Sequence, residues 1–136
     1  MKKKLNCVLL VDDDNVTNFL HSKVIEKADI TDHIEVKLNG QEALDFLTLQ
    51  QKKGNEAIQP SLILLDINMP IMDGWEFLEA YHNQAALANK KTNIVMLTTS
   101  SNPDDKKRAE KLPFISAFRN KPLTLEMLEE ILQEYF

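Results

Sequence analysis

The sequence predicts an α/β fold in which helices cover both faces of a parallel sheet. Strand-like and helix-like segments alternate about five times along the 136 residues, which is the order typical of doubly wound folds. The strand-like runs are short and almost wholly apolar, as in Leu62-Ile63-Leu64-Leu65, and such runs indicate burial on both faces of a sheet. Because the last helix is needed for packing, we expect one domain over residues 1–136, without an output domain.

The first half of the chain supplies two strand–helix pairs. Residues 5–11 form the first expected strand, and Asn15 is the expected N-cap of the helix that follows. That helix should bury an apolar stripe made of Val16, Phe19, Leu20, Val24 and Ala28. Residues 34–38 alternate in polarity, as a half-exposed edge strand does. Asn39-Gly40 then turns the chain into a helix lined by Ala43, Leu44 and Leu47.

The second half supplies three more pairs after a polar stretch, residues 50–59, that we expect to be a loop. The expected strands are 61–66, 94–97 and 114–118. The third expected helix starts near Asp73, and its inward residues are Phe77, Leu78, Tyr81 and Ala85. The fourth covers about 103–112. The last follows an N-cap at Thr124 and has the apolar stripe Leu125, Leu128, Ile131, Leu132 and Tyr135.

Composition sets limits on the class of protein. Apolar residues make up 43% and charged residues 27% of the chain, as in ordinary globular domains. The net charge of −5 argues against a nucleic-acid partner, and no apolar run approaches the roughly 20 residues of a membrane span. The single cysteine, Cys7, cannot form an internal disulfide. We therefore expect a cytoplasmic protein that contacts neither membrane nor nucleic acid.

Polar side chains stand at the carboxyl ends of four expected strands. Asp12 and Asp13 follow the first strand, Asp66 the third, Thr98 the fourth and Lys121 the fifth. In open α/β sheets, chemistry is placed at this edge, so we expect these side chains to converge. Neighbouring carboxylates repel one another unless a cation relieves them, and Mg²⁺ suits two or three carboxylates with open positions.

This set of groups predicts phosphoryl transfer. Asp66 could act as a nucleophile, while Lys121 and Thr98 hold an incoming tetrahedral anion and the metal neutralises its charge.

The same residues resemble the motifs of receiver domains of bacterial two-component response regulators. The aspartate pair follows the first strand, and Asp66-Ile67-Asn68-Met69-Pro70-Ile71-Met72-Asp73-Gly74 follows the third. Thr98 and then Lys121-Pro122 complete the set in the family's order over nearly the whole chain. The resemblance implies a flavodoxin-like (βα)₅ sheet of strand order 2-1-3-4-5.

The resemblance also implies roles for individual residues. Asp66 is similar to the phosphoryl-accepting aspartate, and the Mg²⁺ ligands are expected to be Asp12, Asp13, Asp66 and the backbone carbonyl of Asn68. Lys121 would pair with the phosphoryl oxygens, with a cis bond to Pro122. Thr98 is similar to the switch hydroxyl. Phe118 stands at the switch aromatic position, where tyrosine is more usual, although an aromatic residue on such a strand is often simply part of the core.

Other polar residues are expected to be structural. His21, His33 and His82 have no metal-ligand spacing, so we expect them on the surface. The basic residues of the fourth helix, Lys106, Lys107, Arg108 and Lys111, are expected to face solvent. They belong to the surface formed by the fourth helix, fifth strand and fifth helix, the usual output face of the family, where they favour an acidic partner.

The expected function is therefore a phosphorylation-dependent signalling switch. It would accept a phosphoryl group on Asp66, with Mg²⁺, from a histidine kinase or histidine phosphotransfer domain. It would then bind a downstream protein, or pass the group onward, as a monomer or an activation-dependent dimer. It would assist only its own phosphorylation and dephosphorylation.

Two alternatives are a phosphorylation-independent interaction module and an aspartyl-phosphate phosphatase of the haloacid dehalogenase type. The second places an Asp-x-Asp-x-Thr motif after its first strand and needs a cap domain. Here the candidate nucleophile, Asp66, follows the third strand, and we expect no residues to be left for a cap.

Overall fold

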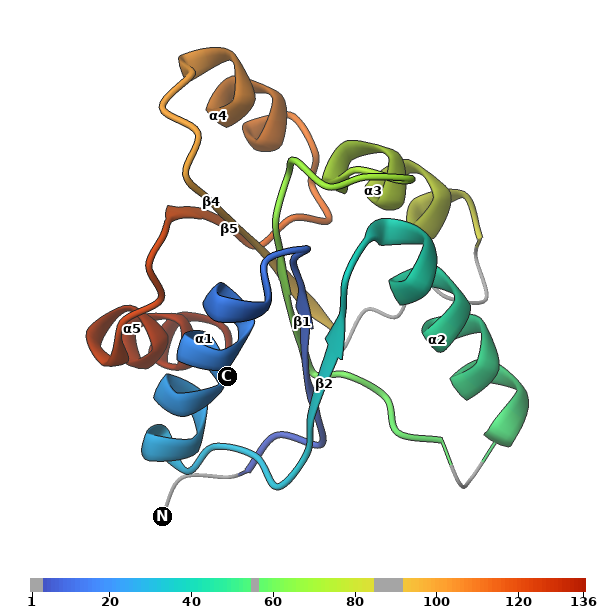
Figure 1. Cartoon of the computed structure of the whole chain (residues 1–136), viewed down its shortest axis with the longest axis vertical. Helices are drawn as coiled ribbons and strands as arrows, with labels where there is room; N and C mark the ends of the chain where they lie inside the picture. Colours follow the sequence, from blue (N-terminus) through green and yellow to red (C-terminus); the bar gives the residue numbers. More distant parts are fainter. Residues whose placement is uncertain (1–3, 55–56, 85–91) are drawn as a thin grey trace.

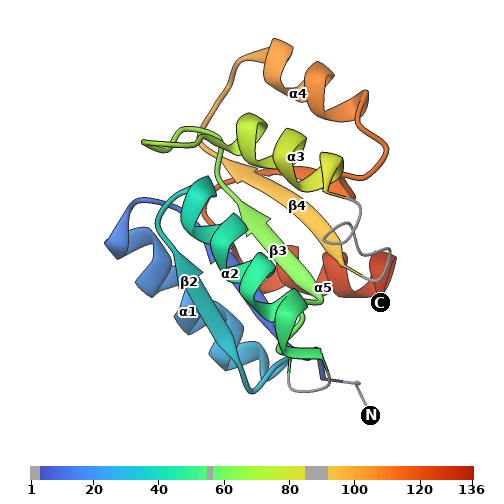
Figure 2. The ribbon, with the colours of Figure 1, turned by 90° about the vertical axis from the view of Figure 1, so that its right-hand side faces the viewer.

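The chain folds as a five-stranded parallel sheet with helices on both faces (Figures 1 and 2). A computed structural model describes residues 4–54, 57–84 and 92–136. The strands are β1 (Val8–Val11), β2 (Ile34–Lys37), β3 (Leu62–Leu65), β4 (Asn93–Thr98) and β5 (Ala117–Asn120). The helices are α1 (Asn15–Ala28), α2 (Gly40–Lys53), α3 (Gly74–Asn83), α4 (Pro103–Glu110) and α5 (Leu125–Tyr135). The strand order is β2-β1-β3-β4-β5, which confirms the predicted flavodoxin-like topology.

Two hydrophobic clusters fix the helices to the sheet. Leu9 and Val11 of β1 point into a cluster with α2, α3 and Ala109 of α4, whereas Val8 and Leu10 point into a second cluster with α1 and α5. Successive residues of a strand face opposite sides of a sheet, so a wholly apolar strand must be covered twice. Figure 1 shows this arrangement, with α1 and α5 on one side of the sheet and α2 and α3 on the other.

The depth of each strand follows its place in the sheet. β1 and β3 are buried at every residue, and β4 is buried from Ile94 onward. β2 is half-buried throughout and lies at one edge, as its alternating polarity predicts. β5 forms the opposite edge and is half-buried over Ala117–Arg119. The carboxyl ends of the central strands thus meet in the middle of one rim.

Several predicted boundaries are wrong. The first strand begins at Val8 instead of residue 5. The fifth strand begins at Ala117 instead of 114, because a turn, closed by the Ile115 N–H on the Leu112 carbonyl at 3.2 Å, occupies the preceding residues. The second helix continues to Lys53, so it includes the first four residues of the predicted loop. The N-cap of α1 is Asp14, whose carboxylate accepts the Val16 N–H, and Asn15 is already helical. Ala85, predicted to face inward, lies outside the described residues.

The orientation of α1 also differs from the prediction. Val24 and Ala28 of the predicted stripe pack against the core, but Val16, Phe19 and Leu20 are exposed. The buried residues of the helix are Asn18, His21 and Ile25. The predicted surface position of His21 is therefore wrong. Hydrophobicity alone predicts the apolar stripe, but two of the inward positions of α1 belong to polar side chains with hydrogen-bond partners elsewhere in the chain.

Within the described part of the chain, no helix combines the length and the apolar character that crossing a membrane requires.

Candidate functional site

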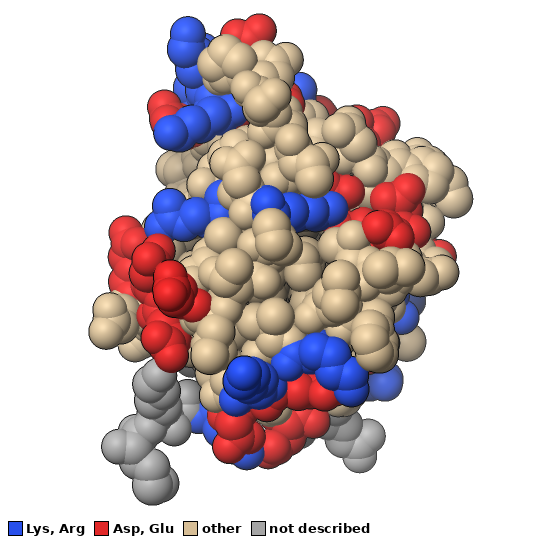
Figure 3. All heavy atoms as spheres, turned by 60° about the vertical axis from the view of Figure 1, so that its left-hand side comes forward, with Lys and Arg blue, Asp and Glu red and all other residues tan. Residues whose placement is uncertain are grey.

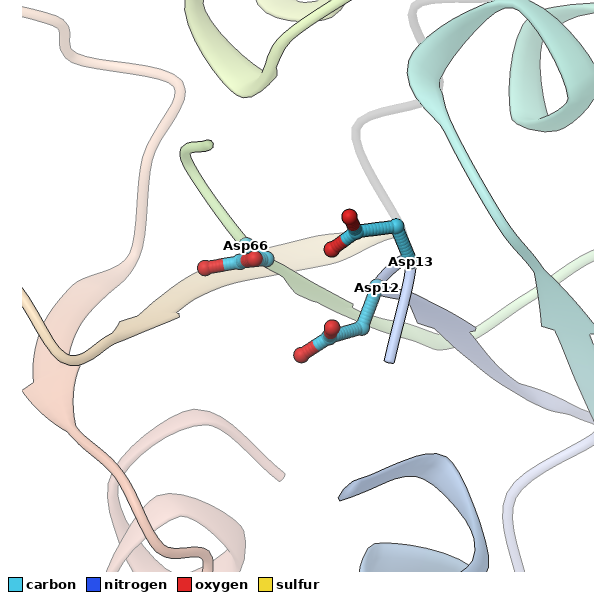
Figure 4. Close-up of side chains that lie close together, drawn as sticks. All are labelled: Asp12, Asp13 and Asp66. Atoms are coloured by element: carbon cyan, nitrogen blue, oxygen red, sulfur yellow. The ribbon is translucent and has the colours of Figure 1, made fainter. Parts of the chain in front are cut away.

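Three carboxylates lie together where β1 and β3 end. Val11 is paired with Leu65 in the parallel register, so the residues that follow, Asp12 and Asp66, leave the sheet side by side. The Asp66 N–H donates to the Val11 carbonyl at 2.9 Å. Oxygen atoms of Asp12, Asp13 and Asp66 lie within 4.8 Å of one another, and Figure 4 shows the three side chains projecting in much the same direction. Asp13 is exposed, whereas Asp12 and Asp66 are buried.

Lys121 joins this cluster from the end of β5. Its ammonium group forms ion pairs with the Asp12 carboxylate and with Asp66 Oδ1, the latter at 3.3 Å. The Lys121 N–H donates to the Thr98 carbonyl at 2.8 Å, which fixes the start of the β5–α5 loop against β4. The Lys121–Pro122 peptide bond is cis, as the resemblance implies. Residues 109 positions apart in sequence therefore meet at one buried ion pair.

Burial and charge act in opposite directions on this cluster. Desolvation raises the pKa of Asp66, although the positive charge of Lys121 works against that shift. Desolvation alone would lower the pKa of Lys121, but its hydrogen bond to Asp12 and the charges of Asp66 and Asp12 outweigh it and raise the pKa. Lys121 is thus held as a cation beside a buried carboxyl group.

The β3–α3 loop brings helix α3 tightly against Asp66. The Gly74 N–H donates to the Ile67 carbonyl at 2.8 Å, and a Cβ atom at Gly74 would lie 2.4 Å from the Asp66 carbonyl oxygen. Asp73 and Glu76 form a capping box at the start of α3. Ile71 in the same loop has φ of 70°, an outlier for a β-branched residue, and its side chain is exposed.

The other predicted site residues are Thr98, Asn68 and Phe118, which lie at the end of β4, in the β3–α3 loop and in β5. Thr98 is fully buried at the end of β4, and its hydroxyl accepts the Ser100 N–H at 3.0 Å. Asn68 is exposed two residues after Asp66. Phe118 is half-buried in β5 and packs against the cluster formed with α2 and α3.

Sequence reasoning missed two residues beside the site, Asn18 and His21. Together with Asp12, Asp66 and Lys121, they line a cavity of about 10 Å³. Their spacing with Ile25, at i, i+3 and i+7, is that of one helix face. This spacing is the sequence feature that could have indicated that Asn18 and His21 face inward.

The chain belongs to the response regulator receiver domain family, whose model matches residues 8–133. Receiver domains are phosphorylation-dependent signalling domains and not classical enzymes. They interact with phosphodonors such as histidine kinases and with downstream targets.

Known proteins similar to this chain include both curated relatives and solved structures. The "Probable methanogenesis regulatory protein FilR2" of Methanothrix harundinacea is 33% identical over 93% of this chain and 79% of its own length. A two-component response regulator from Cytophaga hutchinsonii has 29% identity and a TM-score of 0.87, with 98% of each chain covered. The Mn²⁺-bound form of response regulator Rcp1, a protein of Synechocystis, has 32% identity and a TM-score of 0.71 over 94% of this chain and 89% of that one.

Proposed function

We propose that this chain is a signalling switch that accepts a phosphoryl group on Asp66 from a phosphohistidine of a kinase or phosphotransfer domain. The observation that supports this proposal best is the meeting of Asp66 with Lys121, at 3.3 Å, inside a cluster of three carboxylates. A nucleophilic oxygen, a cation for the transferred anion and an oxygen-rich metal site are the parts that phosphoryl transfer needs.

The reaction is a substitution at phosphorus. A carboxylate oxygen of Asp66 forms the new P–O bond, the P–N bond of the donor breaks, and its electron pair stays on the imidazole nitrogen. Lys121 pairs with the phosphoryl oxygens, which lowers the cost of placing a dianion in a partly buried site.

The carboxylate cluster fits a hard divalent cation. Its donors are oxygen atoms within 4.8 Å of one another, and one of them, on Asp13, is exposed; Mg²⁺ binds such groups while it keeps several waters. We assign Asp12, Asp13, Asp66 and the backbone carbonyl of Asn68 as the residues that hold it. When bound, Mg²⁺ neutralises charge on the phosphoryl oxygens. The Mn²⁺-bound relative supports a divalent-cation site in this chain as well.

The phosphorylated state differs from the free state at β4 and β5. The buried Thr98 hydroxyl and the half-buried Phe118 are the proposed switch residues, since Thr98 ends β4 and also receives the Lys121 N–H on its carbonyl. The new dianion recruits Lys121 and the Thr98 hydroxyl, and Phe118 moves inward as Thr98 is displaced. Such a change biases two packings of one surface and so alters partner affinity.

Two surfaces suit the two partners. The exposed apolar residues Val16, Phe19 and Leu20 of α1 begin four residues after Asp12, so a donor seated on them could bring its phosphohistidine to Asp66. The output surface is α4, β5 and α5. Lysine and arginine gather over α4 at one end of the molecule, whereas acidic side chains cover α5 (Figure 3).

Phosphorylation can be measured directly. Incubation with a small-molecule phosphodonor and Mg²⁺ should add one phosphoryl group, seen by intact mass spectrometry, and the group should be stable in acid and labile in base. Asp66→Asn should abolish labelling, whereas Asp32→Asn, at an exposed carboxylate paired with Lys4, should leave it unchanged. Undiminished labelling of Asp66→Asn would refute the proposed acceptor. Wild-type protein that takes no label would favour the phosphorylation-independent interaction module.

A further inference from the structure

The first half of helix α1 buries Asn18 and His21 beside the site and exposes the apolar residues Val16, Phe19 and Leu20. Asn18 and His21 are each 4% exposed, whereas Val16 and Phe19 are 66% and 60% exposed. Buried polar groups cost free energy unless they are hydrogen-bonded, and departures from the expected pattern gather at functional sites. The contacts of Asn18 and His21 therefore require an account of their own.

Asn18 holds the backbone of Asp12. Its Nδ2 donates to the carbonyl oxygen of Asp12, six residues earlier in the chain, at 2.8 Å. The Asp12 carboxylate is fixed at the same time, because its Oδ1 accepts the Asp14 N–H at 2.9 Å and its Oδ2 pairs with Lys121. The side-chain oxygen of Asn18 is buried and has no hydrogen-bond partner among the described residues. Burial of this unpaired oxygen lowers the stability of the folded protein.

His21 holds the backbone that follows Lys121. Its Nε2 accepts the Leu123 N–H at 3.2 Å, over 102 residues of sequence. Acceptance requires a neutral ring with the proton on Nδ1. Burial lowers the pKa of His21, and the nearby charge of Lys121 lowers it further, which agrees with that neutral form. Leu123 is itself buried, so this N–H would otherwise be left without a partner of comparable geometry.

Both side chains line the same small cavity as Asp12, Asp66 and Lys121. Helix α1 is therefore joined to the two sides of the site by two hydrogen bonds. One bond fixes the residue after β1 and the other fixes the loop after β5.

We propose that Asn18 and His21 are positioning residues, Asn18 for Asp12 and His21 for Lys121. This inference rests on the proposed phosphoryl transfer at Asp66. Neither residue touches the reacting atoms. Asn18 holds the backbone of Asp12, and His21 holds the backbone two residues after Lys121. A displacement of about 1 Å in a group that contacts the reacting atoms can lower the rate on the order of 100-fold.

The first test is a comparison of matched variants. His21→Leu removes the acceptor, and labelling by a small-molecule phosphodonor should fall about 10- to 100-fold, the range seen when outer groups around a site are removed. His21→Gln supplies an oxygen that can accept the Leu123 N–H and should restore most of the rate. Asn18→Leu should lower the rate similarly without lowering the thermal stability. His33→Leu is the control, because His33 directly precedes the first residue of β2, whereas the site lies at the carboxyl ends of the strands. It should leave the rate unchanged.

A double-mutant cycle then separates positioning from general stability. If His21 acts through Lys121, then His21→Leu should have little further effect on the labelling rate in a Lys121→Ala background. Equal losses in both backgrounds would overturn the proposal for His21.

NMR spectroscopy tests the positioning of Lys121 by His21 independently of phosphorylation. In metal-free protein, the Leu123 amide resonance and the Lys121 side-chain resonances should shift in His21→Leu and return toward their wild-type positions in His21→Gln. Unchanged Lys121 resonances would overturn positioning even if the rate fell. If wild-type protein takes no label, the proposed function fails, whereas the shifts of Lys121 still decide whether His21 positions it.

Discussion

At the scale of single residues, Asp66 combines burial with a charge that the proposed reaction requires. Desolvation raises its pKa, and Lys121 offsets the shift only in part. Folding therefore disfavours the carboxylate form of Asp66 relative to the unfolded chain, although the nucleophile is that carboxylate. Sites that hold such disfavoured groups are often stabilised by substitutions that abolish activity.

The stability of Asp66→Asn should reveal this cost. Because the pKa of Asp66 is raised on folding, the folded state binds its proton more readily than the unfolded chain does. The free energy of unfolding must then fall as the pH rises through the interval between the two pKa values. Asparagine cannot ionise, so metal-free Asp66→Asn should be more stable than wild type at neutral pH, and the difference should disappear in acid.

Urea unfolding at a series of pH values, in a chelating buffer, measures this difference. Glu79→Gln, at an exposed carboxylate of α3, is the control and should stay within about 0.5 kcal/mol of wild type throughout. A wild-type protein that is the more stable of the pair at neutral pH would contradict the account of Asp66.

At the scale of elements, the β3–α3 loop depends on one close contact. Gly74 opens α3 directly against the backbone of Asp66, and the space for a side chain is absent. The loop thus holds the proposed nucleophile from behind, while the β1–β3 register holds it from the side.

Gly74→Ala should damage both stability and labelling. A Cβ atom 2.4 Å from the Asp66 carbonyl forces the backbone to move, which typically costs about 1–3 kcal/mol, and the movement displaces Asp66 itself. The melting temperature and the labelling rate should therefore both fall. Glu79→Ala on the same helix should change neither, and a Gly74→Ala protein with wild-type labelling would show that this contact does not position Asp66.

Helix α1 marks the limit of prediction from sequence at this scale. Its existence and length follow from the pattern, but its rotation depends on hydrogen bonds to Asp12 and Leu123. Hydrophobicity cannot weigh those bonds, because one of the partners lies more than a hundred residues away in sequence. The start of β5 was not predicted because Phe114 and Ile115 are apolar enough to resemble a strand, whereas the Ile115 N–H closes a turn on the Leu112 carbonyl.

The outward face of α1 gives a prediction about docking. Phe19→Ser should lower the rate of phosphotransfer from a phosphohistidine protein about tenfold, as removal of an interface anchor worth about 1.4 kcal/mol does. Labelling by a small-molecule phosphodonor should stay the same, because Phe19 is exposed and lies outside the cluster. Equal rates from the protein donor would exclude this face as the docking surface.

At the scale of the whole molecule, the fold was the most predictable feature. Apolar runs that need cover on both faces leave few arrangements, and the carboxyl ends of such strands must share a rim. Asp12, Asp66 and Lys121 could therefore be grouped from their positions alone. That the chain acts as a lone receiver without an output domain stays a prediction.

The switch links this rim to the α4–β5–α5 surface. Phosphorylation should change amide hydrogen exchange over β5 and α4. Phe118→Ala should reduce that change while it keeps the label, because Phe118 packs against the hydrophobic cluster formed with α2 and α3 and is not one of the grouped carboxylates. Hydrogen-exchange mass spectrometry of labelled and unlabelled protein measures both. Loss of the label as well would make Phe118 a structural residue only.

The most direct test of the central claim is to identify the phosphorylated atom. Reduction of freshly labelled protein with borohydride converts an aspartyl phosphate to homoserine, and peptide mass spectrometry locates the product. We predict homoserine at position 66 alone, formed only when Mg²⁺ was present during labelling. A product at Asp12 or Asp13, or a stable phosphoester on Thr98, would contradict the account.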